Sequence, residues 1–157
     1  MTLHFRNACE KDIPQIHSLL KQVNLIHHNG RPDLFKIANK YTDEELSDIL
    51  RDKNRPIYAA ADENDVLVGY AFCIVKQFTD DCMMTDVKTL YIDDLCVDEK
   101  FRGRQVGKRL YNFVRETAKN NNFYNITLNV WTCNESARLF YDACGLKPQK
   151  TCMEEIL

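Results

Sequence analysis

The 157-residue sequence contains no apolar run long enough to cross a membrane. The longest apolar stretches, near residues 58–61 and 71–75, are far shorter than the roughly 20 residues that a transmembrane helix needs. The N-terminus has no basic start followed by an apolar core, so no signal peptide is predicted. An excess of positive charge is also missing, because 21 basic residues face 23 acidic ones and the formal net charge is −2. We therefore expect neither a membrane protein nor a general nucleic-acid binder.

Cysteine spacing also excludes some functions. The seven cysteines are odd in number and form no Cys-x-x-Cys pair, so neither a disulfide framework nor a cysteine metal site is predicted. Without a signal peptide, we interpret them as reduced thiols of a cytoplasmic protein. His27 and His28 have no cysteine or carboxylate nearby at ligand spacing, and no metal site is expected there either.

The overall composition is that of a globular protein, with 45% hydrophobic and 28% charged residues. The chain contains no repeat, no linker and no low-complexity segment. We therefore predict one domain that spans residues 1–157.

Local patterns predict an α/β fold. The expected strands are residues 3–8, 57–62, 66–75, 89–97, 125–130 and 151–156. The expected helices run from Asp12 to about His27, from Thr42 to about Arg51, from near Gly107 to Asn120, and from Asn134 to Gly145. The resulting order, β-α-α-β-β-β-α-β-α-β, predicts a mixed central sheet with helices on both faces.

The stretch from Val97 to Lys108 follows an expected strand and opens an expected helix. Such a loop directs several backbone N–H groups at one point, where the helix dipole adds partial positive charge. No acid follows Glu99 in this stretch, and the loop is rich in basic residues: Lys100, Arg102, Arg104, Lys108 and Arg109. The pattern favours a pyrophosphate site. The alternative is a solvated basic helix start.

A second group of residues lies on the short helix that Asn134 opens and Gly145 closes. Tyr141 is on the apolar face of this helix. The side chain is either a core tyrosine with a satisfied hydroxyl or a phenol placed to donate a proton to a leaving group.

Together, these two segments resemble the GNAT N-acetyltransferase superfamily. Residues 102–107, Arg-Gly-Arg-Gln-Val-Gly, follow a strand that ends Asp-Leu-Cys-Val and resemble the acyl-CoA-binding motif of that superfamily. Asn134, followed by Phe140-Tyr141 and by Gly145, resembles its second motif. The detailed match covers about residues 89–146.

The resemblance implies the GNAT acyl-CoA N-acyltransferase fold, with acetyl-CoA as co-substrate and no metal. Backbone groups of Leu95, Cys96 and Val97 would pair with the pantetheine arm of acetyl-CoA. Asn134 would contact the end of that arm, and Tyr141 would protonate the departing thiolate. The N–H groups that hold the pyrophosphate would come from Arg102, Gly103, Arg104, Gln105, Val106, Gly107 and Lys108.

Two aspartates, Asp93 and Asp94, interrupt the apolar strand before this loop. A base must remove a proton from the acceptor, because an ammonium group has no lone pair. Residues 91–95 resemble the same strand of diamine (polyamine) acetyltransferases, which implies that Asp93 is the base, acting through water. Adjacent strand residues point to opposite faces, so we expect Asp94 to cap or pair with a basic neighbour instead.

Two acidic segments are expected to border the acceptor cleft and to attract a small cationic amine, such as a polyamine or an aminoglycoside. Their members are Asp43, Glu44, Glu45, Asp48 and Asp52, and Asp80, Asp81 and Asp86. Alternatively, each segment is simply a solvated face of the protein.

Other interpretations also stay open. The acceptor could be a protein N-terminal or lysine amine, or the chain could be a nucleotide-binding interaction protein. A non-catalytic acyl-CoA-binding module also stays open, because Gln105 replaces the usual glycine. A homodimer is common in the family.

Overall fold

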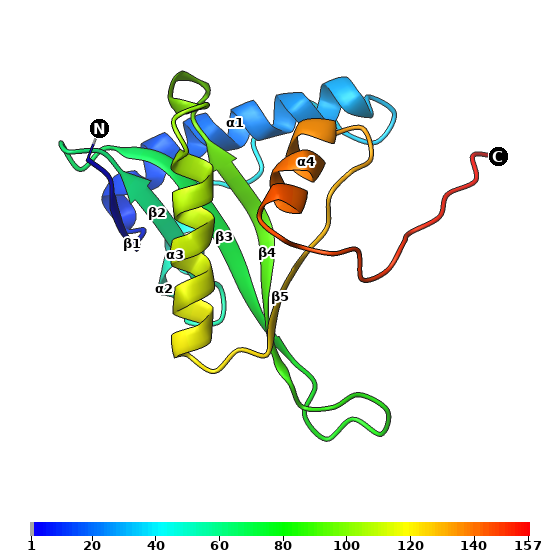
Figure 1. Cartoon of the computed structure of the whole chain (residues 1–157). Coiled ribbons are helices and arrows are strands. Elements are labelled where there is room, and N and C mark those ends of the chain that lie inside the picture. Colours follow the sequence, from blue (N-terminus) through cyan, green and yellow to red (C-terminus); the bar gives the residue numbers. More distant parts are fainter. Residues whose placement is uncertain (1) are drawn as a thin grey trace.

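The apolar segments of the sequence form one five-stranded sheet, in the order β1-β2-β3-β4-β5 (Figure 1). The computed structural model describes residues 2–157. Its strands are β1 (His4–Asn7), β2 (Ile57–Ala61), β3 (Leu67–Gln77), β4 (Lys88–Val97) and β5 (Asn125–Leu128). The first four strands are antiparallel to their neighbours, and β5 runs parallel to β4. The predicted mixed sheet is confirmed.

Each face of the sheet has its own apolar core. The helices are α1 (Ile13–Gly30), α2 (Asp43–Arg51), α3 (Val106–Asn120) and α4 (Glu135–Ala143), with short 3₁₀ turns η1 (Glu10–Asp12) and η2 (Glu99–Phe101). Helices α1 and α2 cover the face that carries Tyr70 and Phe72 of β3, and α3 covers the face that carries Ala71 and Cys73. This alternation along β3 is what a strand buried on both sides requires.

Side-chain caps mark the starts of α2 and α4. Thr42 and Glu45 form the predicted capping box at the start of α2. Asp12 is the N-cap residue of α1, as expected, but its carboxylate makes no cap hydrogen bond to the helix. It accepts hydrogen bonds from the Arg6 guanidinium, at 2.7 and 3.0 Å, and from the backbone N–H of Cys9 at 2.9 Å. The buried carboxylate therefore joins β1 to η1, and burial acts against ionisation while Arg6 lowers its pKa.

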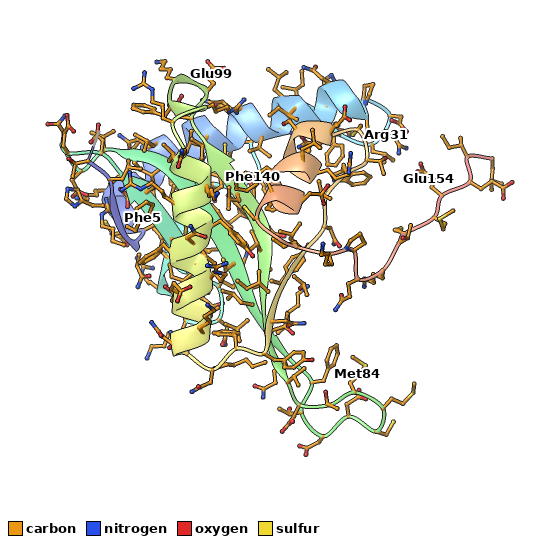
Figure 2. The ribbon with its side chains drawn as sticks, in the orientation of Figure 1. Phe5, Arg31, Met84, Glu99, Phe140 and Glu154 are labelled. Carbon is orange, nitrogen blue, oxygen red and sulfur yellow. The ribbon has the colours of Figure 1, made fainter. Side chains whose placement is uncertain are left out.

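The expected strand over residues 151–156 is not formed. Residues 147–157 have no regular secondary structure and lead away from the sheet (Figure 1). Arg31, beyond the end of α1, holds both carboxylate oxygens of Glu154, at 2.8 and 3.0 Å (Figure 2). An apolar pattern indicates β-propensity only, and a strand also needs a partner edge within reach. Within residues 2–157, this segment pairs with neither edge strand, β1 or β5.

A β-bulge in β4 reorganises the strand at its two aspartates. Phe72 of β3 pairs with Asp94, whereas the next residue, Cys73, pairs with Ile92. Asp93 is therefore the extra residue that no residue of β3 opposes. The insertion shifts the alternation of side chains for the rest of β4, and this shift sets the geometry of the site described next.

Candidate active site

The bulge places both aspartates on the sheet face that α1 and α2 cover. The hydroxyl of Tyr70, a core residue of that face, donates a hydrogen bond of 2.7 Å to Asp94 Oδ2. Lys40, from the segment between α1 and α2, binds Asp93 Oδ2 with its Nζ at 3.0 Å. The expectation that the adjacent aspartates point to opposite faces is thus wrong, because a bulge suspends the two-residue period.

Burial has a strong effect on Asp94. It raises the pKa of this carboxyl from the ordinary 3.8 to about 6, although the Tyr70 hydrogen bond and the Lys40 charge act in the opposite direction. The neighbouring charge of Asp93 adds to the increase. For Lys40, burial acts to lower the pKa, but the ion pair with Asp93 outweighs it, and the net pKa is raised. A carboxyl that titrates near neutral pH is suited to general base catalysis.

Beyond the bulge, no strand in the described residues pairs with β4 on the side away from β3. Pairing with β5 ends at Ile92 and Leu128. The Asp98 N–H donates to the carbonyl of Val68, which precedes Gly69 on β3. Because backbone groups alternate in direction along a strand, Cys96 also faces β3, and Leu95 and Val97 face the open side.

Of the three backbone positions expected to bind pantetheine, two thus face away from β3. The Cys96 side chain is buried as well, with Sγ 3.7 Å from the Leu19 carbonyl. The Val97 carbonyl accepts a hydrogen bond of 3.1 Å from Nε of Arg102. Arg102 therefore crosses the open edge of β4.

The loop predicted to bind the pyrophosphate leads into an uncapped helix start. The first-turn N–H groups of a helix lack intrahelical partners, and here these groups belong to Val106, Gly107 and Lys108. Gln105, the N-cap of α3, gives them no side-chain hydrogen bond. The side chains of Arg102, Arg104 and Lys108 are exposed around this helix start, so a phosphate would meet both N–H donors and positive charge.

Gly103 and Gln105 both have left-handed backbones, with φ of 74° and 61°. Glycine adopts this conformation freely, whereas a residue with a Cβ is strained there. Nothing lies within 4 Å of a Cβ built on Gly103, so its backbone faces open space. At Gly107, a Cβ would make an ordinary van der Waals contact of 3.4 Å with the Phe140 ring of α4.

Gln105→Gly should therefore raise the free energy of unfolding by about 1 kcal/mol, since it removes the left-handed strain. Urea unfolding measures this change. Gln105→Ala, which keeps a Cβ, is the matched control and should not stabilise the protein. The dissociation constant for acetyl-CoA should stay the same or fall in the glycine variant. A large loss of acetyl-CoA affinity would show that the glutamine side chain itself makes a contact.

Helix α4 brings Tyr141 to the same end of β4. The Asn134 side-chain oxygen accepts from the Ala137 N–H at 3.2 Å and so caps α4, as predicted. The asparagine amide nitrogen stays available. Tyr141 packs against Phe140 in an edge-to-face pair, with ring centroids 5.1 Å apart. Burial raises its pKa, and the charge of Asp94 adds to this effect, so its hydroxyl keeps its proton through the neutral range.

Sequence reasoning missed Lys40 and Tyr70, the two partners of the aspartates. Lys40 lies in a segment without periodicity, 53 residues before Asp93. Tyr70 looks like an ordinary core residue of an apolar strand. No local signal could have revealed either contact, since each depends on how distant segments pack.

A cavity of about 400 Å³ opens beside Lys40, between α1, the following segment and the start of α2. Its lining residues are His17, Lys21, Asn39, Lys40, Tyr41, Thr42, Asp43 and Glu45. Only the first acidic segment contributes to this lining. The second segment lies on the β3–β4 loop, which projects past the sheet near Met84 (Figure 2), and Asp81 there accepts from the N–H groups of Met83 and Met84.

The family model described as "Acetyltransferase (GNAT) family" matches residues 23–146. The chain belongs to the GNAT acetyltransferase family. A curated relative, the glucosamine 6-phosphate N-acetyltransferase of Arabidopsis thaliana, is 30% identical over 82 residues. The match covers 52% of this chain and 50% of the relative, so the chain spans about half the length of the curated relative it matches.

Solved structures share the fold over nearly the whole chain. A mutant of the BH1408 protein of Bacillus halodurans matches with a TM-score of 0.93 and 27% identity, covering 98% of this GNAT chain and 99% of that one. The Arabidopsis thaliana glucosamine-6-phosphate N-acetyltransferase structure has a TM-score of 0.72 and 20% identity, with 99% of each chain covered. An aminoglycoside acetyltransferase from an uncultured soil metagenomic sample, in complex with sisomicin, has a TM-score of 0.71 and 20% identity, with 99% and 96% covered.

None of the helices that residues 2–157 form is both long and apolar enough to cross a membrane. In the same residues, no three His, Cys, Asp or Glu side chains gather in a group that could hold a metal ion.

Proposed function

We propose that the chain transfers an acetyl group from acetyl-CoA to a primary amine, by direct transfer in a ternary complex. The observation that carries the proposal is the bulge of β4. It coincides with the end of β4–β5 pairing, and it places two carboxylates next to the backbone of Leu95 and Val97, which faces away from β3. The start of α3 and the Tyr141 hydroxyl lie at the same end of the strand.

The residues present fit acetyl-CoA, which would supply the acetyl thioester. Leu95 and Val97 offer backbone groups to the pantetheine arm. Cys96, which the resemblance also implies, has its backbone turned to β3. The uncapped N–H groups at the start of α3 would hold the pyrophosphate, with help from the Arg102, Arg104 and Lys108 side chains. The Asn134 amide nitrogen is free to contact the end of the arm.

We assign the base to Asp94 in place of Asp93, because burial raises the pKa of Asp94 to about 6 and a base works best when its pKa is near the working pH. Asp94 would accept the ammonium proton, directly or through water. The Leu95 N–H would polarise the thioester carbonyl. Tyr141 would then donate its proton to the departing thiolate.

For the acceptor, we propose a small cationic amine of the polyamine or aminoglycoside type. The support is the paired carboxylates of Asp93 and Asp94, with the acidic start of α2 close to Lys40 around the cavity. A second candidate is an amine that also carries an anionic group, as the name of the Arabidopsis relative describes for that protein. Lys21, Lys40 and His17 in the cavity wall favour this candidate.

The test is an acetylation screen read by mass spectrometry, with acetyl-CoA and a panel of amines. The panel holds polyamines, aminoglycosides, glucosamine 6-phosphate, amino acids and short peptides with free N-termini. We expect one class of small amine to gain an acetyl group, and the product to be lost with Tyr141→Phe. Acetylation of peptides alone would move the acceptor to protein amines. Binding of acetyl-CoA without any product would favour a non-catalytic module.

We also propose a cytoplasmic homodimer. The cytoplasmic location is supported by the seven cysteines, all of them free thiols. The dimer is supported by the tail of residues 147–157, whose Met153, Ile156 and Leu157 are 85%, 79% and 112% exposed. A second copy would cover these apolar side chains, which are costly to leave in water. Light scattering should give the molar mass of a dimer for the chain and that of a monomer for Ile156→Asp. A monomeric wild-type chain would contradict the proposal.

A further inference from the structure

The ammonium group of Lys40 lies where an acceptor amine is needed. Its Nζ is 3.0 Å from Asp93 Oδ2 and 5.3 Å from the ring centroid of Tyr41. Asp94, next to Asp93 on the same face, is close enough for the Lys40 charge to act on its carboxyl. A carboxylate, a second carboxylate and an aromatic ring together form a good environment for an alkylammonium ion.

Two ammonium groups cannot share this position. If the proposed function is correct, the acceptor must bring its amine to the carboxylates at the bulge, because the base is there. Lys40 already fills that place with an amine on a flexible four-carbon stem. The internal ammonium must therefore move away before an external one can bind.

We propose that Asp93, Asp94 and Tyr41 form the binding site for the acceptor's ammonium group, that this site takes a primary alkylammonium, and that Lys40 occupies it in the free protein. The inference rests on the proposed function and adds the position and chemical class of the acceptor group. It also assigns Lys40 as an internal competitor of the acceptor.

The contacts of Lys40 allow it to leave. Its side chain is 43% exposed and that of Asp93 is 29% exposed, so solvent screens the ion pair. Lys40 belongs to a segment without helix or strand, which Asn24 of α1 holds through Lys36 and Ala38 rather than through Lys40 itself. The Lys40 side chain can therefore move into the adjoining cavity, whose wall it already forms.

The experiment measures binding, with n-butylammonium chloride as the probe and isothermal titration calorimetry as the readout. This ion reproduces the end of a lysine side chain. Lys40→Ala should bind it about two- to sixfold more tightly than the wild type, because an exposed ion pair is worth up to about 1 kcal/mol and removal of the internal competitor raises the fraction of free sites. The matched control is Lys36→Ala, which removes the same charge from the same segment and should leave the affinity unchanged.

Asp93→Asn combined with Lys40→Ala should abolish the gain, since the ammonium then loses its carboxylate. Thermal unfolding of each variant verifies that it is folded. Equal or weaker binding by Lys40→Ala would overturn the inference. The titration needs no acetyl transfer. If Lys40→Ala binds the probe more tightly but the protein acetylates no amine, the ammonium site is kept and the proposed function is wrong. If the protein acetylates an amine but Lys40→Ala shows no gain in affinity, the proposed function is kept and the ammonium site is wrong.

Discussion

Asp94→Asn is expected to lower the rate of amine acetylation by a factor of about 10²–10⁴, the usual contribution of a general base. In the wild type, kcat/KM should fall as the pH drops through about 6, because burial raises the pKa of Asp94 to that value and the protonated carboxyl cannot accept a proton. The variant has no such group, so its kcat/KM should not show this decrease at low pH, the acidic limb of the pH profile. Steady-state kinetics across a pH series measures both effects.

Asp93→Asn is the matched control for this prediction. It should keep the acidic limb and raise KM for the amine, because Asp93 binds an ammonium and Asp94 accepts the proton. An acidic limb that persists in Asp94→Asn and vanishes in Asp93→Asn would return the base to Asp93, as the resemblance to diamine acetyltransferases implies.

Stability provides an independent check on Asp94. Because its pKa is raised from 3.8 to about 6 on folding, the folded state holds the proton more tightly than the unfolded state. The contribution of this group to stability is therefore complete below about pH 4 and is lost as the pH rises through about 6. Asp94→Asn should consequently be no less stable than the wild type at neutral pH, while its activity is much lower.

Tyr141→Phe should lower kcat about 10²-fold and leave the dissociation constant of acetyl-CoA unchanged. We expect the lower end of the range for acid catalysis, because a thiolate is already a good leaving group. The raised pKa of Tyr141 keeps its hydroxyl protonated through the neutral range, so no loss of activity from its ionisation should appear near pH 8. Kinetics with the best amine of the screen and calorimetry with acetyl-CoA test the two parts.

Tyr124→Phe serves as the control for Tyr141→Phe. Tyr124 is 74% exposed and precedes β5, so its hydroxyl should not matter. An unchanged rate in Tyr141→Phe, with acetyl-CoA still bound, would remove the general-acid role and leave Tyr141 as a packing residue.

Local sequence patterns predict much of the fold. The capping box at Thr42, the cap at Asn134 and the spacing of apolar residues in α3 place their helices within a few residues. The failures concern features that depend on distant partners. Asp12 resembles an N-cap, but Arg6 and Cys9 use its carboxylate. The apolar tail resembles a strand, but in the described residues it pairs with neither edge strand of the sheet.

In the candidate site, too, the features that depend on local sequence were predictable and those that depend on distant partners were not. The loop from Arg102 to Lys108 is continuous in sequence, and the structure places it before the uncapped start of α3, while its anion-binding role stays a prediction. The surroundings of the two aspartates were not predictable, because a single inserted residue in β4 decides which way they point. Lys40 and Tyr70 join them only through tertiary packing. The roles assigned to all these residues stay predictions until the variants are measured.

The open edge of β4 also bears on aggregation. A strand with unpaired backbone groups is a template on which another chain can add a strand. Arg102 lies across this edge, donating to the Val97 carbonyl, and a long cationic side chain at a strand edge discourages such pairing. The contact thus protects the free protein against edge-to-edge self-association, and bound acetyl-CoA would take over that protection by occupying the same edge.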